Sequence, residues 1–216
     1  MFKVLKKSKN PKFVIVTPLK VGDKIHTQTK KSIRRNDTEF DWVTYEGHNN
    51  IPVNTELGLY CYDQEFQKIQ YMIKIDNDIY MDNNLLDDMY HTIINADDNV
   101  GYVYCPFTYI AYDGAEMLFD YPFNKKKLLD SNYISSNSMI NRNMLEEIGG
   151  FVVDNKYVRL LDWCLWLKML KHGYIGQRIS SDKSFTTPLV EGNVSSRGFD
   201  DYVIKRDRVI EDFINI

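Results

Sequence analysis

Two aspartates separated by one residue, in Asp76-Asn77-Asp78, form the group in this sequence best suited to chemistry. They directly follow the apolar segment 71–75. Side chains two residues apart in an extended chain project to the same side, so the two carboxylates face one point. Such a pair can hold Mn²⁺ or Mg²⁺, and a cation there can bridge diphosphate oxygens and neutralise the charge on a leaving group. The alternative interpretation is that Asp76 and Asp78 are turn and cap residues before the next helix.

Lys74 and Asp162 extend this chemistry. Lys74 shares the face of Asp76 and Asp78 in the extended chain, so it could contact a phosphate or balance their charge. Asp162 stands in the first turn of the helical pattern 160–172, where the helix dipole favours an ionised carboxylate able to accept a proton. A hydroxyl group is a poor nucleophile until its proton is being removed, so Asp162 is the predicted general base. Its alternative role is a helix cap.

Other common catalytic motifs are missing from the sequence. It contains no G-x-x-x-x-G-K-[ST] phosphate loop, no G-x-G-x-x-G, no G-x-S-x-G and no H-E-x-x-H. The histidines show no spacing typical of metal ligands; they are His26, His48, His91 and His172. What remains is carboxylate chemistry.

Composition limits the class of protein. The 216 residues are 44% apolar and 26% charged with a net charge of −3, which predicts one globular domain and no general affinity for nucleic acid. No apolar window is long enough to span a bilayer, and the basic start 3–12 is expected to be a solvated lead-in rather than a signal peptide. Cys61, Cys105 and Cys164 fit no disulfide or zinc framework, which favours a cytoplasmic location.

The apolar pattern predicts the elements that position these residues. Short apolar runs separated by helical patterns favour an α/β fold with a parallel sheet covered on both faces. Asp113-Gly114 predicts the turn of a small hairpin over 109–119, and Gly149 is expected to end a short helix that Asn143 begins. The predicted strands are 13–16, which Pro18 would stop, 40–45, 71–75, 100–105 and 174–179, and the predicted helices are 23–35, 55–69, one from about 82 to 93, 160–172 and 202–214.

Four segments, in order, resemble glycosyltransferase family 2, whose members use nucleotide sugars and have the GT-A fold. The resemblance covers the chain from residue 13 to about residue 197, and the ordered set is more specific than any one motif. The segments are Val14-Ile15-Val16-Thr17-Pro18, the D-x-D-like segment 71–81, Ser136-Asn137-Ser138-Met139-Ile140-Asn141-Arg142 with Ile148-Gly149-Gly150-Phe151, and Leu161-Asp162-Trp163-Cys164-Leu165-Trp166-Leu167-Lys168.

The resemblance implies a single GT-A catalytic domain over 1–216. Its Rossmann-like central sheet is mixed but mainly parallel and flanked by helices, with the small hairpin at one side. Residues 13–105 would bind the nucleotide sugar, and residues 106–198 would bind the acceptor. The implied reaction moves a sugar from a nucleotide-diphosphate sugar, with UDP the first expectation, to a hydroxyl of a glycan or related acceptor. It would depend on a metal ion and invert the configuration, although retention stays open.

The resemblance also implies roles for individual residues. Glu46 would recognise the base, with an exposed turn residue as the equal alternative, and Asp162 would be the base for the acceptor hydroxyl. Trp166 is expected in the core. The remaining expected contacts are Thr17, Pro18, Leu19, Lys74, Asp76 and Asn77 with the nucleotide, Asn137, Gly150 and Trp163 with the sugar or acceptor, and Asp76 and Asp78 with the metal.

Three positions depart from the family pattern. Leu161 stands where a glutamate usually precedes the helix aspartate, the segment 53–58 lacks the usual arginine, and 187–191 lacks the usual histidine. Glu191 could supply a third metal contact instead, or be a surface residue. These departures bear on the donor contacts and the metal ligands more than on the fold.

Two other functions are compatible with parts of the sequence. A sugar-phosphate nucleotidyltransferase would need a loop rich in glycine and arginine after the first strand, which 19–23 does not supply. A degenerate module could bind nucleotide sugars without turnover, but the presence of Asp76, Asp78 and Asp162 together favours an enzyme. Whether the chain is one domain of a longer protein stays open.

Overall fold

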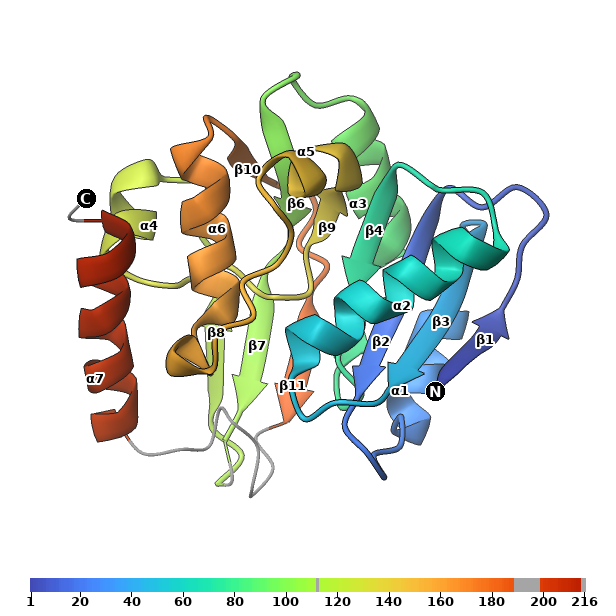
Figure 1. Ribbon diagram of the computed structural model, residues 1–216, viewed down its shortest axis with the longest axis horizontal. Helices are drawn as coiled ribbons and strands as arrows, with labels where there is room; N and C mark the ends of the chain where they lie inside the picture. Colours follow the sequence, from blue (N-terminus) through green and yellow to red (C-terminus); the bar gives the residue numbers. More distant parts are fainter. Residues whose placement is uncertain (112, 189–198, 215–216) are drawn as a thin grey trace.

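The computed structural model describes residues 1–111, 113–188 and 199–214. Its described part contains a seven-stranded sheet in the order β1-β3-β2-β4-β9-β6-β10 and a four-stranded sheet in the order β5-β11-β7-β8 (Figure 1). The strands of the large sheet are β1 (Phe2–Lys6), β2 (Phe13–Leu19), β3 (Phe40–Glu46), β4 (Tyr71–Lys74), β6 (Val100–Tyr104), β9 (Met139–Asn141) and β10 (Ile175–Arg178).

The large sheet is mixed but mainly parallel, as the sequence predicted. β2 pairs in parallel with both β3 and β4, and β10 pairs in parallel with β6. β9 runs antiparallel to its two neighbours, β4 and β6, and β1 runs antiparallel to β3 at the edge. The parallel strands β2, β3 and β4 therefore present their carboxyl ends along one edge, where the D-x-D segment follows β4.

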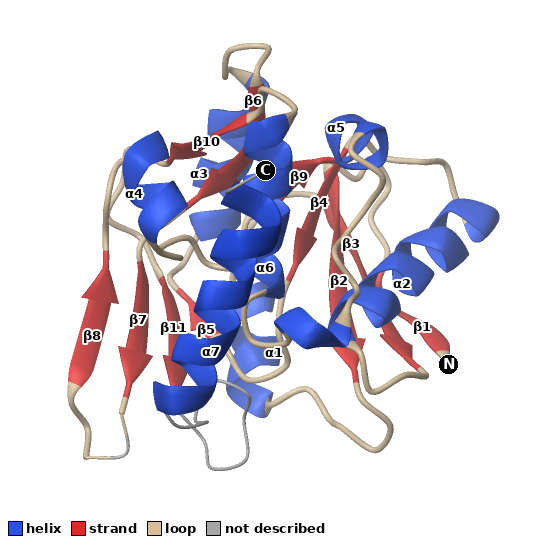
Figure 2. Cartoon of the chain, turned by 60° about the vertical axis from the view of Figure 1, so that its left-hand side comes forward, coloured by secondary structure: helices blue, strands red, loops and turns tan. Residues whose placement is uncertain are grey.

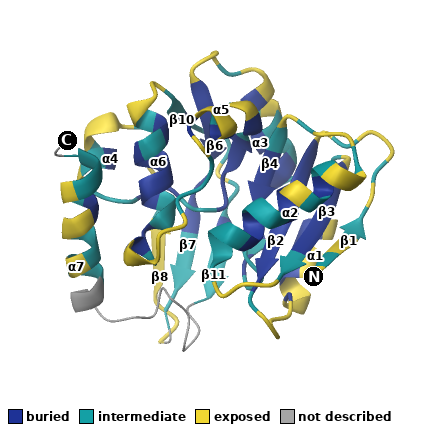
Figure 3. Cartoon of the chain, in the orientation of Figure 1, coloured by how far each residue is buried: buried dark blue, intermediate teal, exposed yellow. Residues whose placement is uncertain are grey.

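Helices cover both faces of this sheet. Along β2, Val14 and Val16 belong to a core with α2 and α6, whereas Phe13 and Ile15 belong to a second core with α1 and α3. Figure 1 shows α2 crossing in front of β2 and β3, and Figure 3 shows these strands mostly buried. The helices are α1 (Thr27–Arg34), α2 (Ile51–Glu65), α3 (Leu85–Ile94), α4 (Lys125–Asp130), α5 (Arg142–Glu147), α6 (Leu161–Lys171) and α7 (Phe199–Val209), with a short 3₁₀ turn, η1 (Asn155–Tyr157), and a π-helical end, η3 (Ile210–Ile214).

The small sheet contains the predicted hairpin. Its strands are β5 (Tyr80–Met81), β7 (Phe107–Ile110), β8 (Glu116–Phe119) and β11 (Phe185–Pro188), and Figure 2 shows them side by side. β7 and β8 pair antiparallel, and Gly114 between them has a φ of +81°. Gly149 also adopts positive φ after α5, as expected, because glycine has no Cβ to clash in that conformation.

The beginning of the chain differs from the prediction. Residues 2–6 form β1, which pairs with β3, rather than a solvated lead-in. The lysines of this segment led to the prediction of an exposed lead-in. Lysine is nevertheless common on edge strands, because its charge discourages pairing with other chains.

Pro18 does not end its strand. It pairs with Tyr45 inside β2, which continues to Leu19. The ladder with β4 ends at Val16, so no bond on that side requires an N–H from Pro18.

Several helix boundaries also differ. α1 begins at Thr27 rather than residue 23, and α3 begins at Leu85 rather than about residue 82. α2 begins at Ile51 rather than residue 55, because the Asn50 side chain accepts a hydrogen bond from Val53 N and caps the helix. α5 is capped by Asn141, which accepts from Asn143 N, so Asn143 is not the cap.

Asp41 in β3 provides a test of the packing between β1, β3 and α2. Its buried carboxylate pairs with Lys7 and accepts hydrogen bonds from Tyr62 Oη (2.5 Å) and Ser8 N (2.8 Å). We expect Asp41→Ala to lower the free energy of unfolding by about 1–3 kcal/mol, since it leaves buried donors without an acceptor. Urea denaturation measures this. The exposed Asp37→Ala serves as control, and an equal effect of the two substitutions would contradict the interpretation.

Candidate functional site

A cleft of about 630 Å³ opens at the carboxyl ends of β2 and β4. Residues 13–105 contribute one wall and residues 106–188 the other. Its lining includes Pro18, Lys74, Asp76, Asn77 and Asp78 from the first part, and Ser136, Asn137, Phe151, Arg159 and Asp162 from the second. The cleft therefore joins the carboxylate pair and the predicted base, which are more than 80 residues apart in the sequence.

The carboxylate of Asp76 has partners on both sides. Its Oδ1 lies 2.6 Å from Lys74 Nζ, and its Oδ2 accepts a hydrogen bond from Ser136 Oγ (3.3 Å). Its backbone N–H donates to Asn137 Oδ1 (3.0 Å). The segment before β9 therefore fixes the position of Asp76, and Asn137 does so with a side chain that is itself buried.

Asn77 ties the same segment to the start of α1. Its carbonyl accepts hydrogen bonds from His26 N (2.9 Å) and Thr29 Oγ1 (3.1 Å), and its side chain donates to Lys24 O (3.1 Å). Asp76 and Asp78 are both partly exposed at the cleft. The D-x-D segment is thus held from both sides while its two carboxylates line the cavity.

These carboxylates fit a divalent cation as a partial ligand set. Mg²⁺ is usually held by one or two carboxylates together with substrate phosphates and water, rather than by a cage of protein ligands. Within the described ranges, no group of three or more His, Cys, Asp or Glu residues is placed to hold a metal ion. Lys74 Nζ shares Asp76 Oδ1 and would compete with a cation for that oxygen. Glu191, the expected third ligand, lies outside the described residues.

Asp162 lies at the start of α6 and lines the cleft. Its Oδ1 accepts a hydrogen bond from Trp163 N (2.9 Å), while the capping position itself is Leu160. Burial raises the pKa of Asp162, and a hydrogen bond from Asn132, the Trp163 N–H and the charge of Lys74 offset part of that rise. A raised pKa makes the carboxylate a stronger base.

Two expected contacts are buried away from the cleft. Thr17 is fully buried and its hydroxyl accepts a hydrogen bond from Trp42 Nε1 (3.0 Å). Trp163 is fully buried and its indole N–H donates to Leu128 O (2.7 Å). Neither placement agrees with the expectation that Thr17 contacts a nucleoside and Trp163 an acceptor. Trp166 stacks on Tyr102 with ring centroids 4.2 Å apart, in the core as expected.

Leu19 and Glu46 lie beside the cleft rather than in its lining. The carbonyl of Leu19 accepts a hydrogen bond from Asn54 Nδ2 (2.7 Å). Glu46 follows Tyr45 at the end of β3, and its carboxylate accepts from Gly22 N (2.8 Å). In this structure Glu46 therefore orders the loop after β2. Of Thr17, Pro18 and Leu19, which were expected to contact the nucleotide, Pro18 lines the cavity.

Gly150 shapes the opposite wall of the cleft. It has a φ of +76°, and a Cβ added there would lie 2.5 Å from Glu56 Oε1. The same oxygen accepts a hydrogen bond from Phe151 N (2.8 Å), and Lys168 Nζ donates to Gly150 O (3.0 Å). Gly150 thus permits the approach of Glu56, which positions Phe151. Glu56 carries no local signal in the sequence, because its partner is 95 residues away.

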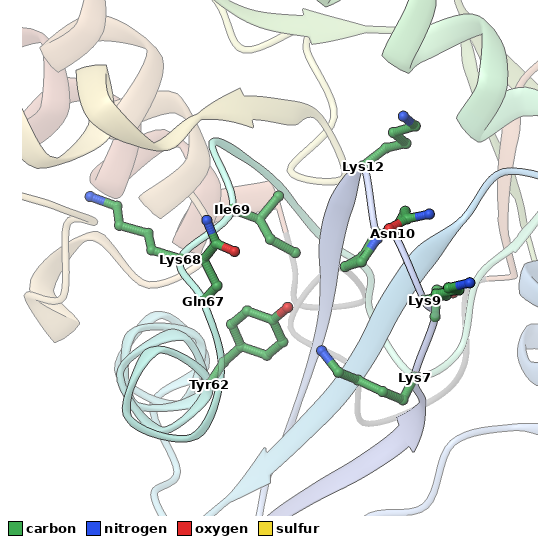
Figure 4. A pocket seen from close by; sticks show the side chains of 10 residues that line it. Lys7, Lys9, Asn10, Lys12, Tyr62, Gln67, Lys68 and Ile69 are labelled. Atoms are coloured by element: carbon green, nitrogen blue, oxygen red, sulfur yellow. The ribbon is translucent and has the colours of Figure 1, made fainter.

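A second hollow, of about 450 Å³, lies at the opposite edge of the sheet, before β2 and β4. Figure 4 shows Lys7 reaching towards Tyr62 across this hollow, with Lys9, Lys12 and Lys68 directed outwards. No carboxylate lines it, so it lacks the acid–base and metal-binding groups of the cleft.

The chain resembles known proteins in its fold but not detectably in its sequence. No protein-family model and no curated protein matches the chain. In the part of the chain that is described, no helix has the length and apolar character needed to cross a membrane.

Solved structures do match. Residues 1–349 of Staphylococcus aureus TarS in complex with UDP-GlcNAc superpose with a TM-score of 0.65 at 12% identity, covering 94% of this chain and 72% of that one. GalNAc-T7 with UDP, GalNAc and Mn²⁺ superposes with a TM-score of 0.58 at 10% identity, covering 94% and 48%. A further structure of S. aureus TarS superposes with a TM-score of 0.56, with 39% of that chain covered. With its mixed, mainly parallel sheet flanked by helices, the chain has the GT-A fold of these glycosyltransferases.

Proposed function

We propose that the chain transfers a sugar from a UDP-sugar to a hydroxyl of a glycan or related acceptor. The observation that carries the proposal is the convergence of Asp76, Asp78 and Asp162 on one cleft at the carboxyl edge of a GT-A sheet. UDP is the first choice of nucleotide because the TarS and GalNAc-T7 structures contain UDP-GlcNAc and UDP.

The donor would lie along the wall formed by residues 13–105. Pro18, His26 and Asn77 line this side and are the proposed neighbours of the nucleotide, with Glu46 as a base-recognising residue from beside the cleft. Asp76 and Asp78 would hold Mn²⁺ or Mg²⁺, and the Mn²⁺ in the GalNAc-T7 structure supports this choice. When bound, the cation supplies positive charge for the diphosphate oxygens.

Lys74 contributes a second positive charge to the floor of the cleft, beside Asp76. Its side chain is 11% exposed and its ammonium group pairs with Asp76. Its charge also acts on Asp162. Lys74 therefore keeps a fixed cation close to both the metal-binding carboxylates and the proposed base.

Asp162 would act on the acceptor. Its carboxylate takes the proton of the acceptor hydroxyl as that oxygen forms a bond with the anomeric carbon of the sugar. The bond from the anomeric carbon to the diphosphate breaks in the same displacement, and the nucleoside diphosphate leaves with the bonding electrons. Attack opposite to the leaving group inverts the configuration at that carbon.

Two parts of the second wall complete the proposed acceptor side. Phe151, held by Glu56, lines the cleft, as does Asn137, which positions Asp76. Gly150 lies behind the lining and permits the approach of Glu56. This assigns the sequence motif around Gly150 to the shape of the cleft rather than to direct contact with a sugar.

The cytoplasm is the proposed location. Its support is that all three cysteines are free, with Cys105 and Cys164 buried, which is typical of proteins in a reducing compartment.

Replacing the carboxylates tests the donor site. We expect Asp78→Asn and Asp76→Asn to weaken Mn²⁺-dependent binding of UDP-GlcNAc at least about tenfold, since the neutral amide is a poor ligand for a hard cation. Calorimetric titration with and without Mn²⁺ measures this, with melting temperature as a check on folding. Asp113→Asn in the exposed hairpin turn is the control. Unchanged affinity in both site variants would exclude this metal site.

Replacing the base tests the transfer step. Asp162→Asn should retain UDP-GlcNAc binding while the rate of sugar transfer or slow donor hydrolysis falls by about 10²-fold or more, the usual scale for a lost general base. Near-normal turnover of the variant would remove Asp162 from this role. Binding without turnover in the native protein would favour the degenerate module, and formation of a nucleotide sugar from UTP and a sugar phosphate would favour a nucleotidyltransferase.

The pH dependence tests the state of the base. Only ionised Asp162 accepts a proton, so kcat/KM should fall as the pH drops through its pKa. Because burial raises that pKa, the fall should begin above the ordinary carboxyl value of about 3.9. Asn132→Ala removes a hydrogen bond that lowers the pKa and should move the acidic limb to higher pH. An acidic limb that does not move in this variant would contradict the assignment.

A further inference from the structure

The turn between η1 and α6 contains an arginine where its geometry calls for glycine. Leu160 N donates to Tyr157 O (2.8 Å), Val158 has φ −48° and ψ 134°, and Arg159 has φ +87°. These values match a type II turn, whose third residue has positive φ and is therefore usually glycine or asparagine. Among the residues that the structure describes, Arg159 is the one residue with positive φ that is neither glycine nor asparagine.

Both ends of this turn are fixed by the core. Tyr157 and Leu160 are 5% and 2% exposed, and Tyr157 Oη donates to Asp212 Oδ2 (2.6 Å). Leu160 O accepts the hydrogen bond from Cys164 N in the first turn of α6. The backbone of Arg159 therefore cannot relax to negative φ without moving the start of the helix that holds Asp162. Strain of this kind concentrates at functional sites, where the surrounding structure enforces it.

The side chain of Arg159 belongs to the cleft. Arg159 lines the cavity and is partly exposed, and its guanidinium carbon lies 5.4 Å from the ring centroid of Tyr202 in α7. Of the other lysine and arginine residues in the described lining, Lys20 and Lys74 come from the opposite wall, and Lys74 pairs with Asp76. Arg159 thus supplies the positive charge of the wall that carries the proposed base.

We infer that Arg159 binds a phosphate group in the cleft, and that a glycine position carries arginine in order to place the guanidinium there. A guanidinium group offers two parallel N–H donors to the oxygens of one phosphate. The phosphate is either the diphosphate of the donor or a phosphate on the acceptor. This inference rests on the proposed function, because it assigns a ligand group to the same cleft.

Paired substitutions separate the guanidinium from the strain. Arg159→Ala and Arg159→Gly both remove the side chain, but only glycine relieves the positive φ. We expect the melting temperature of Arg159→Gly to exceed that of Arg159→Ala by about 2–4 °C. Both variants should nevertheless lose binding of a phosphate-bearing ligand by about tenfold or more, the scale of a hydrogen bond between charged groups. Arg159→Lys keeps a charge without the planar fork and should show a smaller loss.

Three probes identify the source of the phosphate by calorimetry. UDP and uridine differ in the diphosphate alone, so loss of UDP affinity with unchanged uridine affinity assigns Arg159 to the donor. Unchanged UDP affinity, with loss of glycerol 3-phosphate binding to the protein saturated with UDP, assigns it to the acceptor.

Unchanged ligand binding in the Arg159 variants would overturn the inference. If both variants bind UDP and glycerol 3-phosphate as the native protein does, and transfer sugar with unchanged KM values, Arg159 has no ligand role and the inference fails while the proposed function stands. If the native protein itself binds no UDP, the proposed function fails first.

Discussion

The positive charge of Lys74 is the constraint around which the cleft is built. An ammonium group that is largely removed from water is costly unless a carboxylate and hydrogen-bond acceptors surround it. Asp76 meets that requirement at 2.6 Å, and this fixes the orientation of a side chain that a short loop alone would leave free. The same charge, after the hydrogen bonds from Asn132 and Trp163 N, offsets part of the rise that burial causes in the pKa of Asp162. One buried cation thus couples the proposed metal-binding and proton-accepting groups.

Contacts across the cleft hold its two walls at a defined separation. Asn137 binds the backbone of Asp76, Glu56 binds the backbone of Phe151, and the Asn50 side chain donates to Val153 O (2.8 Å) and Asn155 Oδ1 (3.0 Å). These contacts connect residues between 61 and 105 positions apart. These contacts place Asp76 on one wall of the cleft and Phe151 on the other.

Much of the fold could be predicted because its strongest signals are local. Buried parallel strands appear as continuous apolar runs, and α3 shows its four buried apolar positions at helical spacing, so both types of element were located within a few residues. β9 and β5 were not predicted, because strands of three and two residues are too short to show a periodic pattern. The placement of Asp76 and Asp78 followed from the rule that the carboxyl ends of parallel strands share an edge, whereas Asp162, in the first turn of α6, was expected there from the family resemblance. A motif does not indicate which face a residue takes, so Thr17 and Trp163 were expected in the cleft but lie in the core. Glu56 and Arg159 could not be predicted, because a distant partner defines one and a backbone angle the other.

The position of β9 has a consequence for how the polypeptide reaches its native state. This short strand joins β4 to β6, although residues 105–138, which follow β6 in the chain, must be made first. Until residues 139–141 arrive, β4 offers an open edge and β6 has no link to the rest of the sheet. A nascent or truncated chain that stops earlier would expose unpaired backbone groups, and such edges invite association with other chains. The sheet can therefore be completed only after β9 has been made. The residues that carry the carboxylate pair do not form an autonomous unit without it.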